Sequence, residues 1–129
     1  MDTSVWINLL RRKNVAWLDA DRLLSFVTCG PIIQEVLQGL LEGPRTSVFR
    51  EDFLAIPRLS DPVGVAVFLE AAEIYRRGRQ KGYTIRSSTD CLIAAIAIQN
   101  NVPVWHRDRD YSAIAKFTSL RAYTGTTSR

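Results

Sequence analysis

The ten residues from Asp90 to Gln99 are apolar nearly all the way round a helix. A helix of this kind is buried on every side, so other elements must cover it in layers. Its apolar part, Cys91 to Ile98, is the longest apolar stretch of the chain and has eight residues. Because a membrane-spanning helix needs about 20 such residues, we expect a soluble globular domain that makes no use of a membrane.

The chain has 129 residues, which is the length of one domain. Hydrophobic residues make up 47% and charged residues 23%, a balance that excludes a disordered chain. We predict a single domain over residues 1–123, followed by a flexible C-terminal tail over residues 124–129.

Strand-like apolar segments alternate with helical segments along the chain. The predicted helices span residues 4–12, 31–41, 47–54, 61–79, 90–99 and 111–116, and the predicted strands span residues 22–28, 55–59, 102–105 and 120–123. Pro31 and Pro62 are placed in the first turns of their helices, where proline is tolerated. The alternation predicts an α/β fold around a mostly parallel sheet.

The start of the chain departs from the usual α/β pattern. A buried parallel strand normally opens such a domain as a continuous apolar run, but only Met1 precedes Asp2. We therefore expect that the first strand is truncated, that the natural start lies a few codons upstream, and that the chain as written is marginally stable. No secretory signal is visible, so Cys29 and Cys91 are expected to be reduced and buried, and the protein to be cytoplasmic.

Charge is distributed unevenly between the two parts of the chain. Residues 1–75 hold 7 basic and 10 acidic side chains, whereas residues 76–129 hold 10 basic and 3 acidic ones. A basic part suits a polyanion such as RNA or DNA, but it also suits a plain solvated surface. Charge alone does not decide between these two readings.

Several kinds of catalytic site are excluded or disfavoured by the residue inventory. His106 is the single histidine, so a histidine-rich zinc site cannot form, and the two cysteines do not make a CxxC pair. There is no P-loop, no GxGxxG and no GxSxG elbow, which disfavours nucleotide binding and a Ser-His-Asp triad.

Carboxylates are the remaining candidates. Asp90 heads the buried helix, and Asp108 and Asp110 follow the predicted strand at 102–105. Asp2 lies at the edge of the first element. In a parallel α/β sheet these positions face one rim, where several ionised carboxylates need a cation such as Mg²⁺ or Mn²⁺ between them. Taken singly, each of these acids could instead be a cap or turn residue.

Four segments resemble the motifs of PIN-domain ribonucleases. Asp2–Ile7 resembles the opening motif, Asp90–Ala95 resembles the third motif, and His106–Tyr111 resembles the D-x-D-[FY] element. Glu35 matches the second acidic position. The likeness extends over Met1–Tyr123 and is greatest to VapC-type toxins of toxin–antitoxin pairs.

The resemblance implies a fold, an activity and partners. The fold would be a three-layer α/β/α arrangement around a parallel sheet of about five strands. The activity would be endoribonuclease cleavage of RNA with one or two Mg²⁺ or Mn²⁺ ions as cofactors. The implied partners are a small VapB-type antitoxin and a second copy of the chain in a homodimer.

The motif match also implies roles for individual residues. The implied catalytic acids are Asp2, Glu35, Asp90 and Asp108, and the implied metal ligands are Asp2, Asp90, Asp108 and Asp110. Ser4 matches a small polar residue that supports the first acid. Candidate phosphate contacts are Arg86, Arg107 and Arg109, which could equally be plain surface arginines.

Two alternatives come from other functional classes. The first is a non-catalytic nucleic-acid-binding or regulatory α/β domain, in which the acids are caps and the basic part does the binding. The second is a phospho-receiver domain, which needs an acidic pair near the first strand and a late lysine. Asp2 has no acidic neighbour and Lys116 is the only late lysine, so this second alternative is disfavoured.

Overall fold

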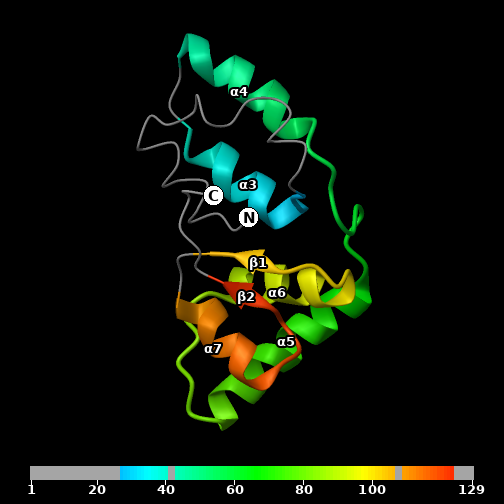
Figure 1. Ribbon diagram of the computed structural model, residues 1–129, viewed down its shortest axis with the longest axis vertical. Coiled ribbons are helices and arrows are strands. Elements are labelled where there is room, and N and C mark those ends of the chain that lie inside the picture. The colour runs from blue at the N-terminus through cyan, green and yellow to red at the C-terminus, as the bar shows by residue number, and fades with distance from the viewer. Residues whose placement is uncertain (1–26, 41–42, 107–108, 124–129) are drawn as a thin grey trace.

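The computed structural model describes residues 27–40, 43–106 and 109–123 (Figure 1). The helices in these ranges are α3 (Gly30–Gln38), α4 (Pro44–Leu54), α5 (Val65–Gln80), α6 (Ser88–Gln99) and α7 (Arg109–Phe117). The strands are β1 (Val104–Trp105) and β2 (Ala122–Tyr123). Each of these seven elements coincides with an element predicted from the sequence, within a few residues at each end.

The strands of the described ranges run parallel, as predicted. Val104 pairs with Ala122, and Trp105 pairs with Tyr123. An isolated parallel bridge joins Thr28 to Arg58, and there the Thr28 N–H donates to the carbonyl of Pro57 at 2.9 Å. The two-stranded sheet and the bridge agree with a parallel α/β fold, while the predicted five-strand sheet is not tested by these residues.

Figure 1 shows how the described elements are arranged. The helices α3 and α4 lie on one side of β1 and β2, and α5, α6 and α7 lie on the other. The most extensive contact between described elements is that of α5 with α6, and α6 also touches α3 and α7. Among the described residues, each helix is too short or too polar to cross a lipid bilayer.

The helix α6 confirms the prediction made from its all-round apolar composition. Its buried side chains face α5, α7 and α3, and they include Ala94, Ala95 and Ile96, which are at most 1% exposed. The alanines add little bulk, so neighbouring helices can approach α6 closely on several sides. The position of α6 in the core fixes the place of its first turn, which carries Asp90.

The predicted start of one helix and one predicted strand are wrong. The helix α5 begins at Val65, so Pro62 does not lie in its first turn. Instead Ser60 has a positive φ of 49° and the peptide bond between Asp61 and Pro62 is cis, so the chain turns here before Gly64 starts the helix. The predicted strand at 55–59 is reduced to an isolated bridge, because Ala55 still caps α4 and the segment bonds to Thr28 only through the Pro57 carbonyl and the Leu59 N–H.

The segment after α5 turns back to place the start of α6. Gly82 has a φ of +84°, a conformation that glycine adopts without a steric penalty. The Tyr83 N–H then donates to the carbonyl of Gly78 at 2.9 Å. Gly78 carries no Cβ, and an added one would lie only 2.5 Å from Cδ1 of Ile85, so this glycine lets the returning segment pack tightly on α5.

The two cysteines are free thiols and both are buried, as predicted. Burial raises the pKa of the Cys29 thiol. Burial also raises the pKa of the Cys91 thiol to about 11, with a further contribution from the negative charges of Asp90 and Asp110. Since the thiolate is the reactive form, neither cysteine has the character of a nucleophile.

Candidate functional site

The first turn of α6 presents Asp90 in a fixed position. Ser87 is the N-cap of the helix, and its Oγ accepts a hydrogen bond from the Asp90 N–H at 3.3 Å. Asp90 therefore sits at the positive end of the helix dipole, which favours a negative charge. Its side chain is only 6% exposed, so the carboxylate is held inside the protein.

Asp110 ties the first turn of α7 to the segment before α6. Its Oδ2 accepts hydrogen bonds from the N–H groups of Arg86 at 3.0 Å and Ser87 at 3.1 Å. Asp110 is 2% exposed, and a carboxylate that accepts backbone N–H groups in a buried site makes strong, charge-assisted bonds. The starts of α6 and α7 are thus held together at this point.

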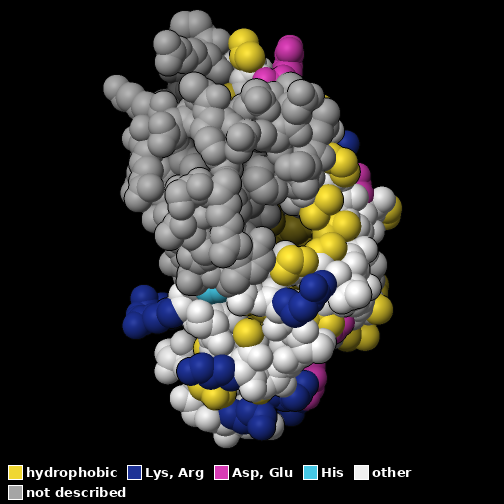
Figure 2. Space-filling model, in the orientation of Figure 1, with side chains coloured by type: hydrophobic (Ala, Val, Ile, Leu, Met, Phe, Trp, Pro, Cys, Tyr) yellow, Lys and Arg dark blue, Asp and Glu magenta, His cyan; other side chains and the backbone are white. Residues whose placement is uncertain are grey.

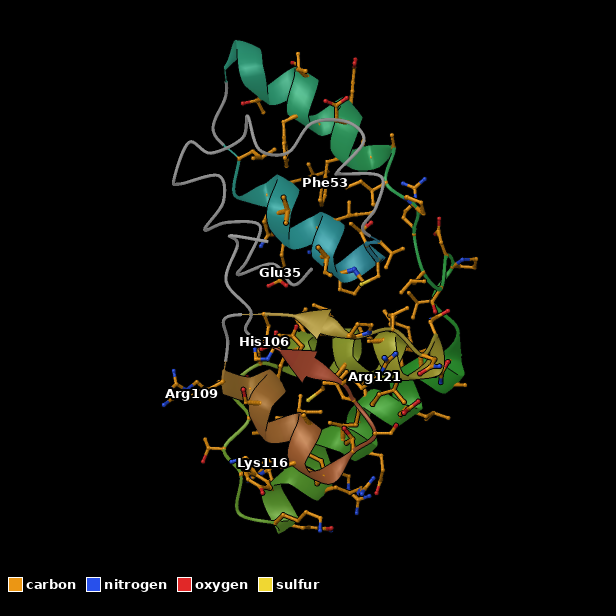
Figure 3. The ribbon with its side chains drawn as sticks, viewed as in Figure 1. Glu35, Phe53, His106, Arg109, Lys116 and Arg121 are labelled. Atoms are coloured by element: carbon orange, nitrogen blue, oxygen red, sulfur yellow. The ribbon has the colours of Figure 1, made fainter. Side chains whose placement is uncertain are left out.

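Tyr111 provides a second link between the two helices. Its hydroxyl donates a hydrogen bond to Oδ1 of Asp90 at 3.0 Å, and the tyrosine is 0% exposed. The ring of His106 lies against the tyrosine ring, with centroids 5.2 Å apart and a tilt of 46°. Figure 3 shows His106 beside β1, close to the start of α7.

The chemistry of this site fits a hard divalent cation. The carboxylates of Asp90 and Asp110 are close enough to Cys91 for both to raise the pKa of its thiol. Asp90 Oδ2 and Asp110 Oδ1 are buried oxygens as well. Two ionised carboxylates in one buried place repel each other, and Mg²⁺ or Mn²⁺, which prefer oxygen ligands, would relieve that repulsion.

Within the described ranges, no group of three His, Cys, Asp or Glu side chains is close enough to hold a metal. The predicted set extends beyond those ranges, because Asp2, Ser4, Arg107 and Asp108 lie outside the residues that the structure describes. The convergence of Asp2 and Asp108 with the buried pair therefore stays a prediction.

Glu35 lies on the side of α3 that faces the part of the molecule holding β1 and α6 (Figure 3). It is half-buried and lines a hollow of about 440 Å³ together with Thr89, the residue before Asp90. The other lining residues come from α3, α5, α6 and the segment before α5. The structure thus brings Glu35 to the same end of α6 as Asp90.

The two described candidate arginines, Arg86 and Arg109, have exposed side chains. Arg86 uses its backbone N–H in the bond to Asp110, and its side chain is exposed. Figure 3 shows Arg109 projecting outward from the start of α7. Both positions are open to a ligand outside the site.

The motif pattern included Tyr111 but gave it no role, and it did not single out Ser87 as the helix cap. A signal for Tyr111 was present, because a tyrosine inside a short amphipathic helix is buried and its hydroxyl then needs a partner. The partner itself could not be identified, since Asp90 is 21 residues away in the sequence. The pairing follows only from the packing of α6 against α7.

Comparisons with known proteins show the family of the chain. Residues 1–117 match the PIN domain family. The chain is 37% identical over 128 residues to Ribonuclease VapC11 of Mycobacterium tuberculosis and equally to VapC ribonuclease Mb1587 of Mycobacterium bovis, with 95% of each chain covered. It is also 28% identical over 125 residues to Ribonuclease VapC18 of Mycobacterium tuberculosis, and the matched region covers 92% of this chain and 88% of VapC18. The chain is therefore a member of the PIN-domain family, of the VapC type.

Proposed function

We propose that this protein is a divalent-metal-dependent endoribonuclease, the toxin of a type II toxin–antitoxin pair. The observation that carries the proposal is the pair of buried carboxylates, Asp90 and Asp110, fixed at the adjoining starts of α6 and α7. One acid is enough to cap the start of a helix, so capping alone does not explain two buried acids in one place. The ribonuclease names of relatives that span nearly the whole chain support the same conclusion.

The proposed roles follow the match between the chain and the family motifs. Asp2, Asp90, Asp108 and Asp110 would hold Mg²⁺ or Mn²⁺, with Ser4 supporting Asp2. Asp110 accepts two backbone N–H groups at Oδ2, and these bonds fix the orientation of the carboxylate that would face a metal. Glu35, beside the hollow that reaches Thr89, would orient the attacking water.

Hydrolysis of a phosphodiester needs an activated water and a stabilised leaving oxygen. A divalent ion held by these carboxylates would lower the pKa of the attacking water and would stabilise the negative charge that develops on the phosphate and the leaving oxygen. The chain's own contribution is to hold its carboxylates rigidly, through the backbone bonds to Asp110 and the Tyr111 bond to Asp90. Such preorganisation avoids rearrangement during the reaction.

The surface supports RNA as the substrate. On the face shown in Figure 2, Lys and Arg side chains gather over the part of the molecule where Figure 1 places α5, α7 and β2. The exposed basic residues of this part are Arg76, Arg79, Lys81, Arg86, Arg109, Lys116 and Arg121. In the sequence, Arg86 lies four residues before Asp90, Arg109 directly precedes Asp110, and Arg107 directly precedes the predicted ligand Asp108. These three would contact phosphates outside the pocket.

Metal removal tests the proposed activity. Purified full-length protein, freed of any antitoxin, should cleave RNA in Mg²⁺ or Mn²⁺ and lose that activity in EDTA, because without a cation nothing offsets the negative charges of the carboxylates and the phosphate. Cleavage should return when excess Mn²⁺ is added. Gel analysis of end-labelled RNA measures both steps.

RNA binding without cleavage in either metal would favour the alternative, a non-catalytic nucleic-acid-binding domain. Cleavage that persists in EDTA would contradict a metal-dependent mechanism. The cellular setting proposed here is the cytoplasm, where RNA and an antitoxin are available together.

We also propose that the protein pairs with a second copy and with a small VapB-type antitoxin. The support for a homodimer is a row of exposed apolar side chains at helical spacing on α5. Val65, Phe68 and Leu69 are 73%, 51% and 67% exposed. Such a row is unfavourable in water and is typical of a surface that a partner covers.

Leu69→Glu should therefore shift the protein from dimer to monomer, because it puts a charge into the apolar row. Sedimentation equilibrium measures the change. Val48→Glu is the matched control, since Val48 is 60% exposed on α4 and away from the row. An unchanged dimer in Leu69→Glu would place the interface elsewhere, and a monomeric wild type would contradict the homodimer.

A further inference from the structure

One hydrogen bond joins the buried acid of α6 to a side chain that the proposed function does not use. Tyr111 donates its hydroxyl hydrogen to Oδ1 of Asp90 at 3.0 Å. The tyrosine is completely buried and the aspartate nearly so. Water therefore has little access to this bond, and its geometry is set by the protein alone.

Tyr111 is itself held firmly in place. The preceding residue, Asp110, anchors α7 by accepting the backbone N–H groups of Arg86 and Ser87. The ring of His106 packs against the tyrosine ring on the other side. Because Ser87 also caps the helix that carries Asp90, the tyrosine hydroxyl and the aspartate backbone are fixed in one common frame.

An aspartate side chain at the start of a helix has two torsion angles that must be set before it can serve as a ligand. The cap at Ser87 holds the backbone N–H of Asp90 and does not itself bond to the carboxylate. The bond from Tyr111 to Oδ1 selects one orientation and thereby determines where Oδ2 points. Carboxylates that bind metals are commonly oriented by such hydrogen bonds, and losing one typically weakens metal binding by about 10–100-fold.

We propose that Tyr111 is a positioning residue, whose hydroxyl orients the Asp90 carboxylate for a divalent cation. This inference rests on the proposed function, in which Asp90 is a metal ligand. The competing explanation is that the bond merely satisfies a buried hydroxyl. The two explanations differ in one measurable respect, because a bond that only satisfies the hydroxyl contributes to stability and not to metal affinity.

The experiment compares the Mn²⁺ affinity of the full-length wild type with that of Tyr111→Phe, which removes one oxygen and keeps the ring. Isothermal titration calorimetry should show Mn²⁺ binding weakened by about 10–100-fold. In cleavage assays at saturating Mn²⁺, kcat should fall while KM for RNA stays the same, because Tyr111 is buried away from the substrate.

Two controls separate positioning from stability. Tyr83→Phe deletes a hydroxyl from a tyrosine that stacks on Phe117 instead, and should leave Mn²⁺ affinity within about two-fold. Ile114→Val trims a fully buried side chain of α7, so it loosens the same helix without altering the Asp90 contact. All variants are measured well below the lowest melting midpoint of the set, with circular dichroism confirming that each is folded.

Unchanged Mn²⁺ affinity and unchanged kcat in Tyr111→Phe would overturn the inference. An equal loss in Ile114→Val would do so as well, because the effect would then come from general loosening of α7. Asp90→Asn distinguishes a failure of the proposed function. If Asp90→Asn binds Mn²⁺ as tightly as the wild type, Asp90 is no metal ligand and the proposed function fails. If Asp90→Asn loses Mn²⁺ binding while Tyr111→Phe keeps it, the proposed function stands and only the role of Tyr111 is contradicted.

Discussion

Asp90→Asn should reduce metal-dependent RNA cleavage by about 1,000-fold or more. The substitution keeps the shape of the side chain and removes the charge that a divalent cation needs. Stabilisation of the transition state by such a cation contributes several kcal/mol, and about 1.4 kcal/mol corresponds to a tenfold change in rate. The fold should persist, because an amide oxygen can still accept the Tyr111 hydroxyl that now bonds to Oδ1. Initial rates on a defined RNA in Mn²⁺ measure the loss.

Asp52→Asn is the matched control for this experiment. Asp52 is an exposed acid of α4, so the control makes the same change in net charge at the surface. Its cleavage rate should equal that of the wild type, and the melting temperature of Asp90→Asn should not fall, since a buried charge has been removed. Equal cleavage by Asp90→Asn and wild type would disprove the proposed enzymatic site.

Ile96→Ala should lower the free energy of unfolding by about 2–5 kcal/mol, because it leaves a cavity in the most buried helix. Ile96 is 1% exposed on α6. With a urea m-value of about 1–3 kcal/mol/M, the unfolding midpoint should fall by about 1–2 M or more. Urea titration followed by circular dichroism gives the shift.

The comparison for this variant is Val48→Ala, which trims a 60% exposed side chain on α4. Its effect should stay within about 0.5 kcal/mol, as is usual for surface positions. A loss below about 1 kcal/mol in Ile96→Ala would show that α6 does not form the centre of the core in solution.

Local pattern was sufficient to predict the helices of the described ranges. The all-round apolar composition of α6 placed it in the core, and its first residues placed Asp90 at a helix start. Both features depend on residues close together in the sequence. The start of α5 was predicted wrongly because proline at Pro62 suits a first helical turn and a preceding turn equally well, and only the packed structure decides between them.

The internal architecture of the site could not be predicted in the same way. The Tyr111 hydroxyl meets Asp90 because α6 and α7 pack against each other, and no local spacing encodes that contact. The two backbone bonds to Asp110 likewise join segments 23 and 24 residues apart. Sequence motifs identified the acids, whereas the groups that hold those acids in place emerged from tertiary structure.

Locating a bound metal tests directly whether the carboxylates of Asp90 and Asp110 form a metal site. A crystal of the full-length protein soaked in Mn²⁺ should give an anomalous diffraction peak about 2.0–2.3 Å from an oxygen of Asp90, the separation expected for coordination. This peak should disappear in Asp90→Asn crystals. A strong Mn²⁺ peak elsewhere, with the Asp90 carboxylate making no bond to it, would contradict the assignment of this carboxylate pair as the metal site.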